Sequence, residues 1–316
     1  MGQRTLLIAL VGAACVLPFV LPSYMVFQLT MVLVYALALL GLNLLVGFNG
    51  QISLGHGAFF ALGAYTAAML MEHAGWPYWA TIPAAALVGG IVGYLFGLPA
   101  LKLDGVYLAM ATFALGVVTP QLLKYRGLET WTGGSQGLVL FKPDAPFGLP
   151  LNPDQWLYFF CLGVAIAMFV IAHNLLRGAM GLNLVAVRDH PIAAEAMGVN
   201  NARIKSITFG ISALYTSVGG ALSAIVVQFV APDSFNVFLS ITLLVGAVVG
   251  GLSSLSGALF GAVFIQFVPR FAELVSKAAP WAVYGAILLA LMLLWPSGVA
   301  GGIARLRTWF FSRRQA

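Results

Sequence analysis

The chain has 316 residues, of which 61% are hydrophobic and only 8% are charged, with a mean hydropathy of +0.99 and a net charge of +6. Soluble domains carry about a quarter charged residues, so this composition excludes an ordinary soluble protein and indicates an integral membrane protein. The apolar runs are continuous and do not alternate, which favours an all-α polytopic bundle over a β-barrel. We therefore predict one transmembrane domain over residues 1–316.

A membrane-spanning helix needs about 20 apolar residues, and about ten such runs fit the chain by that rule. The predicted spans are 5–22 (an uncleaved first span), 25–47, 52–71, 77–100, 105–123, 155–174, 204–227, 235–251, 257–275 and 281–297. If both termini are cytoplasmic, the cytoplasmic side carries ten of the 15 basic residues. This distribution follows the positive-inside bias, so we predict that orientation.

The first unusual segment is GFNGQISLGHG at 47–57, which is too polar and glycine-rich for a continuous helix in lipid. Irregular backbone survives at membrane depth only where protein or a water-filled cavity covers it. A broken helix there would offer free N–H groups to an anion such as a carboxylate, with Ser53 and His56 as side-chain donors. The alternatives are a tight cytoplasmic turn and, for His56, a structural hydrogen bond to a neighbouring helix.

A predicted outer loop over 127–154 contains the sequence WTGGSQGL at 131–138. Glycine and serine are turn-forming residues, so a turn is the first prediction for this loop. A contact to an external partner is the alternative, with Thr132, Gly133, Gly134 and Ser135 as the candidate residues.

The longest polar interruption is the segment 177–205, which is predicted to be a cytoplasmic loop. Pro191 suits the first position of a helix and Gly198 the position just past its end. The helix between them is under two turns long, so it is not stable alone and must dock on a partner or on the membrane domain. A loop lying on the lipid surface is the alternative.

Several functional motifs are missing from the sequence. There is no phosphate loop for nucleotides and no H-E-x-x-H or C-x-x-C pattern, so we predict neither a catalytic site nor a metal or cofactor. Cys15 and Cys161 lie in apolar runs and are predicted to be buried hydrophobes. The basic residues flank spans and do not indicate nucleic acid. Nearly all acidic residues lie at span ends, whereas a proton- or sodium-driven transporter more often has a mid-span acid.

The segment GLNLLVGFNGQISLGHGAFFALGAYTAAML at 41–70 resembles the signature of branched-chain amino-acid ABC importer permeases, and GQISLGHGAFF is closer to the LivM-type subunit than to its LivH-type partner. The segments at 187–222, 131–138 and 249–264 resemble the same family. The resemblance covers about residues 35–300 in four ordered blocks.

The resemblance implies an inner-membrane permease subunit that works with a related permease, two cytoplasmic ABC ATPases and an external substrate-binding protein. It also implies an ATPase-coupling helix within 177–205 and a translocation path near residues 50–57. The implied coupling residues are Arg188, Asp189, Pro191, Ile192, Glu195, Ala196, Met197 and Gly198. The implied path residues are Asn49, Gln51, Ser53, Gly55, His56 and Gly57.

The sequence leaves three questions open: the substrate, the energy source and whether the chain transports a substrate at all. The substrate is leucine, isoleucine or valine, or else urea or a short amide. An ATP-independent channel or secondary transporter is a different class, which the lack of a mid-span acid disfavours. A membrane-complex subunit that does not transport is a third class. The sequence also leaves open whether the permease pairs with itself or with a relative.

Overall fold

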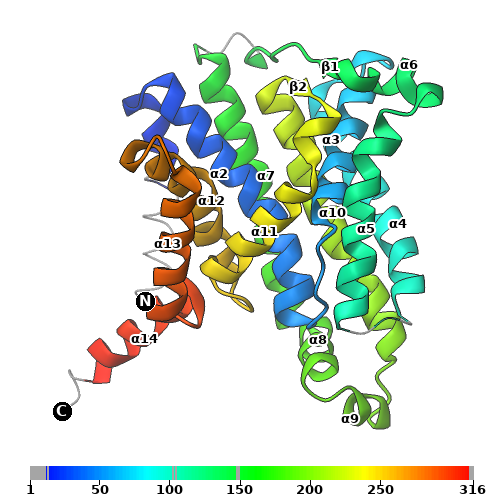
Figure 1. Ribbon diagram of the computed structural model, residues 1–316, viewed down its shortest axis with the longest axis vertical. Coiled ribbons are helices and arrows are strands. Elements are labelled where there is room, and N and C mark those ends of the chain that lie inside the picture. The colour runs from blue at the N-terminus through cyan, green and yellow to red at the C-terminus, as the bar shows by residue number, and fades with distance from the viewer. Residues whose placement is uncertain (1–11, 13, 102, 104, 147–149, 313–316) are drawn as a thin grey trace.

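The computed structural model describes residues 12, 14–101, 103, 105–146 and 150–312. Residues 5–11 and 13 of the predicted first span, 5–22, lie outside these residues. The described chain is a bundle of helices with one short two-stranded sheet (Figure 1). In chain order the helices and strands are α2 (Ser23–Asn43), η1 (Leu44–Phe48), α3 (His56–Glu72), α4 (Tyr78–Ala100), α5 (Val106–Leu123), η2 (Arg126–Leu128), α6 (Glu129–Thr132), η3 (Gly134–Gln136), β1 (Leu138–Val139), α7 (Pro153–Arg177), α8 (Ala179–Asp189), α9 (Pro191–Ala196), α10 (Asn201–Val227), β2 (Phe229–Val230), η5 (Pro232–Phe235), α11 (Val237–Gly250), α12 (Leu255–Val275), α13 (Pro280–Leu294) and α14 (Gly298–Ser312).

The all-α polytopic prediction is confirmed. Seven helical segments in the described residues are long and apolar enough to cross a membrane. α3 and α11 occupy two further predicted spans but are shorter, and the 14 residues of α11 reach only about 21 Å at 1.5 Å per residue. α3 follows the non-helical residues 49–55, and α11 follows the short helix η5.

α2 and α10 form the centre of the bundle. About 78% of the apolar window of each is buried, against 22% for α5 and α7. α10 packs against α2, α3 and α4, and α12 closes the other side of α2. The peripheral helices expose leucine, valine and phenylalanine, as expected for surfaces that face lipid or another membrane subunit.

Small residues allow the central helices to approach closely, as is common in membrane bundles. A Cβ atom added to Gly63 of α3 would lie 1.9 Å from the Ser217 carbonyl oxygen of α10. A Cβ added to Gly220 would lie 1.9 Å from the Phe60 carbonyl oxygen in return. α3 and α10 therefore cross with their backbones in contact.

The two ends of the bundle differ (Figure 1). At one end, which we call the β end, β1 pairs antiparallel with β2, and Leu138 lies opposite Val230. At the other, which we call the α9 end, α8 and α9 project beyond the bundle. The segment 177–205 is therefore not one loop, because α8 adds three helical turns that we did not predict.

Candidate functional site

The polar segment between α2 and α3 is irregular backbone inside the bundle. α2 ends in the π-helical turn η1, residues 49–55 are not helical, and α3 begins only at His56. His56 bonds to Ser212, which lies near the middle of α10, and the Leu54 N–H donates to Thr112 within α5 at 2.9 Å. The segment rises beside α5 before α3 begins (Figure 1). The irregular backbone of the broken-helix prediction is therefore present. Gly50 lies against Arg188 of α8, so the chain also turns at the α9 end, as the alternative predicted.

The residues predicted to border the translocation path are all buried in this conformation. The set comprises Asn49, Gln51, Ser53, Gly55, His56 and Gly57. The Gly57 N–H, the type of donor expected to face an anion, instead donates to the Ser240 hydroxyl of α11 at 2.9 Å. The Asn49 amide N–H donates to Gln51 at 2.9 Å, and its carbonyl oxygen Oδ1 is buried with no partner among the described residues.

His56 joins three segments of the bundle. Its Nε2 lies 2.7 Å from the Ser212 hydroxyl, which itself donates to the Gly41 carbonyl at 2.6 Å. Because that hydroxyl proton is already used, Nε2 carries the proton and donates to Ser212. Nδ1 then accepts from the Ser53 hydroxyl, 3.0 Å away. His56 is therefore a neutral imidazole with both nitrogens satisfied, as the structural alternative predicted.

We expect His56→Ala to lower the free energy of unfolding by about 2–4 kcal/mol, because it leaves a cavity and removes a partner from two buried hydroxyls. Thermal unfolding in detergent measures the effect. His56→Phe keeps the ring against Phe59 (centroids 5.9 Å apart) but not the hydrogen bonds, and it should recover only part of the loss. Full recovery in His56→Phe would mean that packing alone explains the residue.

α9 presents an exposed apolar surface at the α9 end. Pro191 is its first residue, and Gly198 follows it with φ +88°, so the predicted boundaries are confirmed within a residue. Ala194 packs inward with Leu184 and Val187 of α8. Ile192 and Met197 are each 85% exposed. Glu195, Ala196 and Gly198 are also exposed.

Arg188, at the end of α8, turns back toward the bundle. Its Nη1 donates to the Gly47 carbonyl at 2.7 Å and to the Ser253 hydroxyl at 2.9 Å. Its Nε donates to Asp189 Oδ1 at 2.8 Å, and this hydrogen bond lowers the pKa of the Asp189 carboxyl below its usual value. The pair therefore stays ionised at neutral pH. The predicted coupling residues thus divide into an outward set on α9 and an inward-facing Arg188.

The loop at the β end is a compact turn, as predicted. Gly133, Gly134 and Gly137 all have positive φ. Thr132 is buried and donates to the carbonyls of Leu123 and Leu128 at 2.8 and 3.0 Å, so its hydroxyl is used within the chain. Of the four predicted external-contact residues, Gly134 is also buried, Gly133 is half-buried and only Ser135 is exposed.

Sequence reasoning missed the residues that hold these segments in place. They are polar residues within or beside apolar runs: Asn43, Thr112, Ser212, Ser240 and Ser253. It also missed the large exposed side chains beside the β-end turn, Trp131, Val139 and Phe141. The sequence signal that could have identified the first group is a polar residue in an otherwise apolar run.

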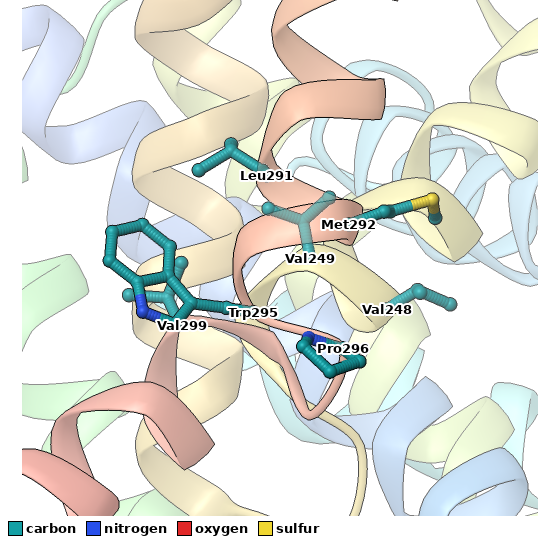
Figure 2. Close-up of a pocket in the computed structure, with 7 residues that line it drawn as sticks. All are labelled: Val248, Val249, Leu291, Met292, Trp295, Pro296 and Val299. Carbon is teal, nitrogen blue, oxygen red and sulfur yellow. The ribbon is translucent and has the colours of Figure 1, made fainter.

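Two apolar cavities lie elsewhere in the bundle. One, of about 220 Å³, lies between the end of α11 and the turn from α13 to α14, and Figure 2 shows Trp295, Pro296, Val248 and Val249 around it. Another, of about 290 Å³, lies among α3, α4 and α5. None of the predicted path residues lines either cavity. In the described part of the chain, no three His, Cys, Asp or Glu side chains gather to hold a metal ion.

Comparison with known proteins agrees with these features. The family model described as branched-chain amino acid transport system / permease component matches residues 24–295. The chain is 31% identical to the high-affinity branched-chain amino acid transport system permease protein LivM of Salmonella typhimurium over 321 residues, which cover 94% of this chain and 75% of that protein. The Escherichia coli LivM protein is 30% identical with the same coverage.

A more distant relative has a different stated role. The chain is 27% identical to the autoinducer 2 import system permease protein LsrC of Escherichia coli over 304 residues, covering 89% of this chain and 84% of that protein. Both kinds of relative are permease proteins of transport systems, and both match along most of the helical bundle described above. The chain therefore belongs to the family of branched-chain amino acid transport system permease components, and it is a multi-pass inner-membrane permease subunit of an ABC importer.

Proposed function

We propose that this permease subunit imports branched-chain amino acids: leucine, isoleucine or valine. The observation that carries the proposal is the similarity to LivM, which is 31% identical across 94% of the chain and is named for the transport of these substrates. The similarity to LsrC is lower, at 27% across 89% of the chain. The lack of a phosphate loop agrees with an energy source in another subunit.

The complex is proposed to contain two cytoplasmic ATPases, and the surface of α9 is the proposed contact with one of them, which places the α9 end in the cytoplasm. Ile192 and Met197 support this role, because two apolar side chains that are 85% exposed on a polar segment are suited to burial by a partner. We also propose that both termini are cytoplasmic, as the distribution of basic residues favours.

Residues 49–57 are the proposed border of the translocation path, which opens when the bundle rearranges. The place of His56 beside the middle of α10 supports this role, as does the irregular backbone at 49–55. The buried carbonyl oxygen of Asn49, unpaired among the described residues, is a suitable acceptor for a substrate ammonium group.

The β end is the proposed face for an external substrate-binding protein. Trp131, Val139 and Phe141 are 56%, 67% and 88% exposed, and Ser135 lies in the turn beside them. We assign the contact to this cluster more than to Thr132 and Gly134, which are buried. A related permease subunit is the proposed partner within the membrane, against the exposed helices at the bundle periphery.

The proposal is tested on the complex purified through a tag on this chain and reconstituted into liposomes with its binding protein. We expect ATP-dependent uptake of radiolabelled leucine that unlabelled isoleucine and valine suppress, and that urea, acetamide and autoinducer 2 do not. Uptake suppressed only by one of the latter would contradict the proposed substrate. Uptake by the purified chain alone, driven by an ion gradient, would contradict the ATP-driven class.

A further inference from the structure

Arg188 connects two turns that are far apart in the sequence. The guanidinium Nη1 donates to the Gly47 carbonyl and the Ser253 hydroxyl, at 2.7 and 2.9 Å. The same Ser253 hydroxyl donates to the Gly47 carbonyl at 2.6 Å. We call this three-residue contact the Arg188 bridge. It brings the end of α8 together with the turns that precede α3 and α12.

Both turns have uncommon backbone geometry. Gly47 lies in the π-helical turn η1, and such turns are rare and frequent at functional sites. Ser253 has φ +62°, which is uncommon for a residue other than glycine. The Asn43 side chain fixes the second turn, because it accepts from the Ser253 N–H at 2.8 Å and donates to the Ser254 carbonyl at 2.7 Å. Such geometry persists only where the surroundings enforce it.

The Arg188 side chain is held on the α8 side of the bridge as well. Asp189 orients the guanidinium through Nε. Gly50 lies against the aliphatic part of Arg188, where an added Cβ would approach Cγ to 2.8 Å. Phe48 of η1 packs on the apolar cluster that joins α8 to Ala194 of α9. Packed side chains therefore connect α9 with the end of α8, where Arg188 lies.

We propose that Arg188 is a positioning residue for transport: through the Arg188 bridge it transmits the movement of α9 to the two turns at 44–50 and 251–254. This inference rests on the proposed function, in which ATPases move α9. Arginine suits the task because Nη1 donates to the two bridge acceptors while Nε of the same rigid plane donates to Asp189, whereas a lysine ammonium is a compact point charge on a flexible stem. Arg188 itself faces the bundle and not the ATPase.

The test compares substrate moved with ATP hydrolysed in liposomes that contain the full complex. We expect Arg188→Ala to retain ATP hydrolysis while uptake per ATP falls by about tenfold, within the range of ordinary coupling between sites. Arg188→Lys should recover part of the ratio. Ser253→Ala should lower it less, and the double variant should not add the two effects, because both changes break one contact. Arg177→Ala, which removes an exposed cation from the end of α7, is the matched control and should keep the ratio.

A second measurement does not depend on the substrate. Amide hydrogen exchange is followed in the complex with and without a trapped, non-hydrolysed ATP analogue. In the wild type we expect the analogue to change exchange at α9 and at both turns, and in Arg188→Ala at α9 only. Responses at both turns in Arg188→Ala would overturn the proposal. Parallel loss of uptake and hydrolysis in Arg188→Ala, with Ser253→Ala neutral, would also overturn it by leaving a purely structural role. If α9 does not respond even in the wild type, the proposed ATPase partnership itself fails.

Discussion

Replacing Gly220 by leucine is expected to prevent the bundle from assembling. The close crossing of α10 and α3 leaves no space for a side chain, because an added Cβ would meet the Phe60 carbonyl oxygen at 1.9 Å. Backbone cannot rotate away as a side chain can, so the two helices would have to separate. The loss of folding free energy should exceed the value of about 1–3 kcal/mol that is typical of an overpacked core. Loss of the monodisperse peak in size-exclusion chromatography, or a fall in Tm of about 10 °C or more, measures it.

A matched control exists on α7. An added Cβ at Gly163 has no atom within 4 Å, and the residue lies in a helix of similar length. Gly163→Leu should therefore change the free energy of unfolding by no more than about 0.5 kcal/mol. If Gly220→Leu and Gly163→Leu unfolded at the same temperature, the contact between the α3 and α10 backbones would be wrong.

The predictable parts of the fold are those with local causes. The length and apolarity of α2 and α10 mark them in the sequence as spans, because crossing a membrane sets a minimum number of apolar residues. The bounds of α9 follow from Pro191 and Gly198, whose backbone preferences act within their own neighbourhood. The break before α3 was predictable for the same reason, since it follows from glycine and polar residues between two apolar runs.

The contacts that organise the site depend on residues far apart in the chain. Asn43 holds a turn more than 200 residues away, and nothing near Asn43 indicates which backbone groups it meets. The same holds for Arg188, which carries a local signal of a cytoplasmic cation and yet bonds into the bundle. Local patterns supply the donors and acceptors, whereas the packing of α2, α8 and α11–α12 decides how they pair.

The sequence analysis also did not predict the helix α8. Gly181, Leu184 and Val187 recur every three residues along it and are buried, and Leu184 and Val187 pack with Ala194 of α9 and Ile204 of α10. That spacing is a helical pattern, but the surrounding polar residues favoured a loop. At the β end, Thr132 was a reasonable surface candidate by residue type, and only the fold shows that its hydroxyl bonds to two carbonyls.

The double variant Ile192→Asp/Met197→Asp is expected to separate the ATPases from the permease. Both side chains are 85% exposed in the chain, so the change should leave the bundle folded. In an ATPase groove the same positions would bury two carboxylates without partners, which is strongly unfavourable. Loss of central apolar contacts in an interface costs about 2 kcal/mol or more. We expect binding of the ATPases to weaken at least about thirtyfold, since 1.4 kcal/mol is tenfold and a loss of about 2 kcal/mol is therefore about thirtyfold.

Co-purification of ATPase subunits with the tagged permease measures that loss, and ATP-dependent uptake should disappear with it. Leu182→Asp is the matched control, because Leu182 is an apolar side chain 73% exposed on the neighbouring helix α8. It should retain the ATPases. Ala194→Asp should instead destabilise the permease itself. Ala194 is buried against α8, so its replacement should lower Tm before any partner is added. Full retention of ATPases by Ile192→Asp/Met197→Asp would mean that α9 does not form the contact, and the coupling surface would then have to lie on α8 or the start of α10.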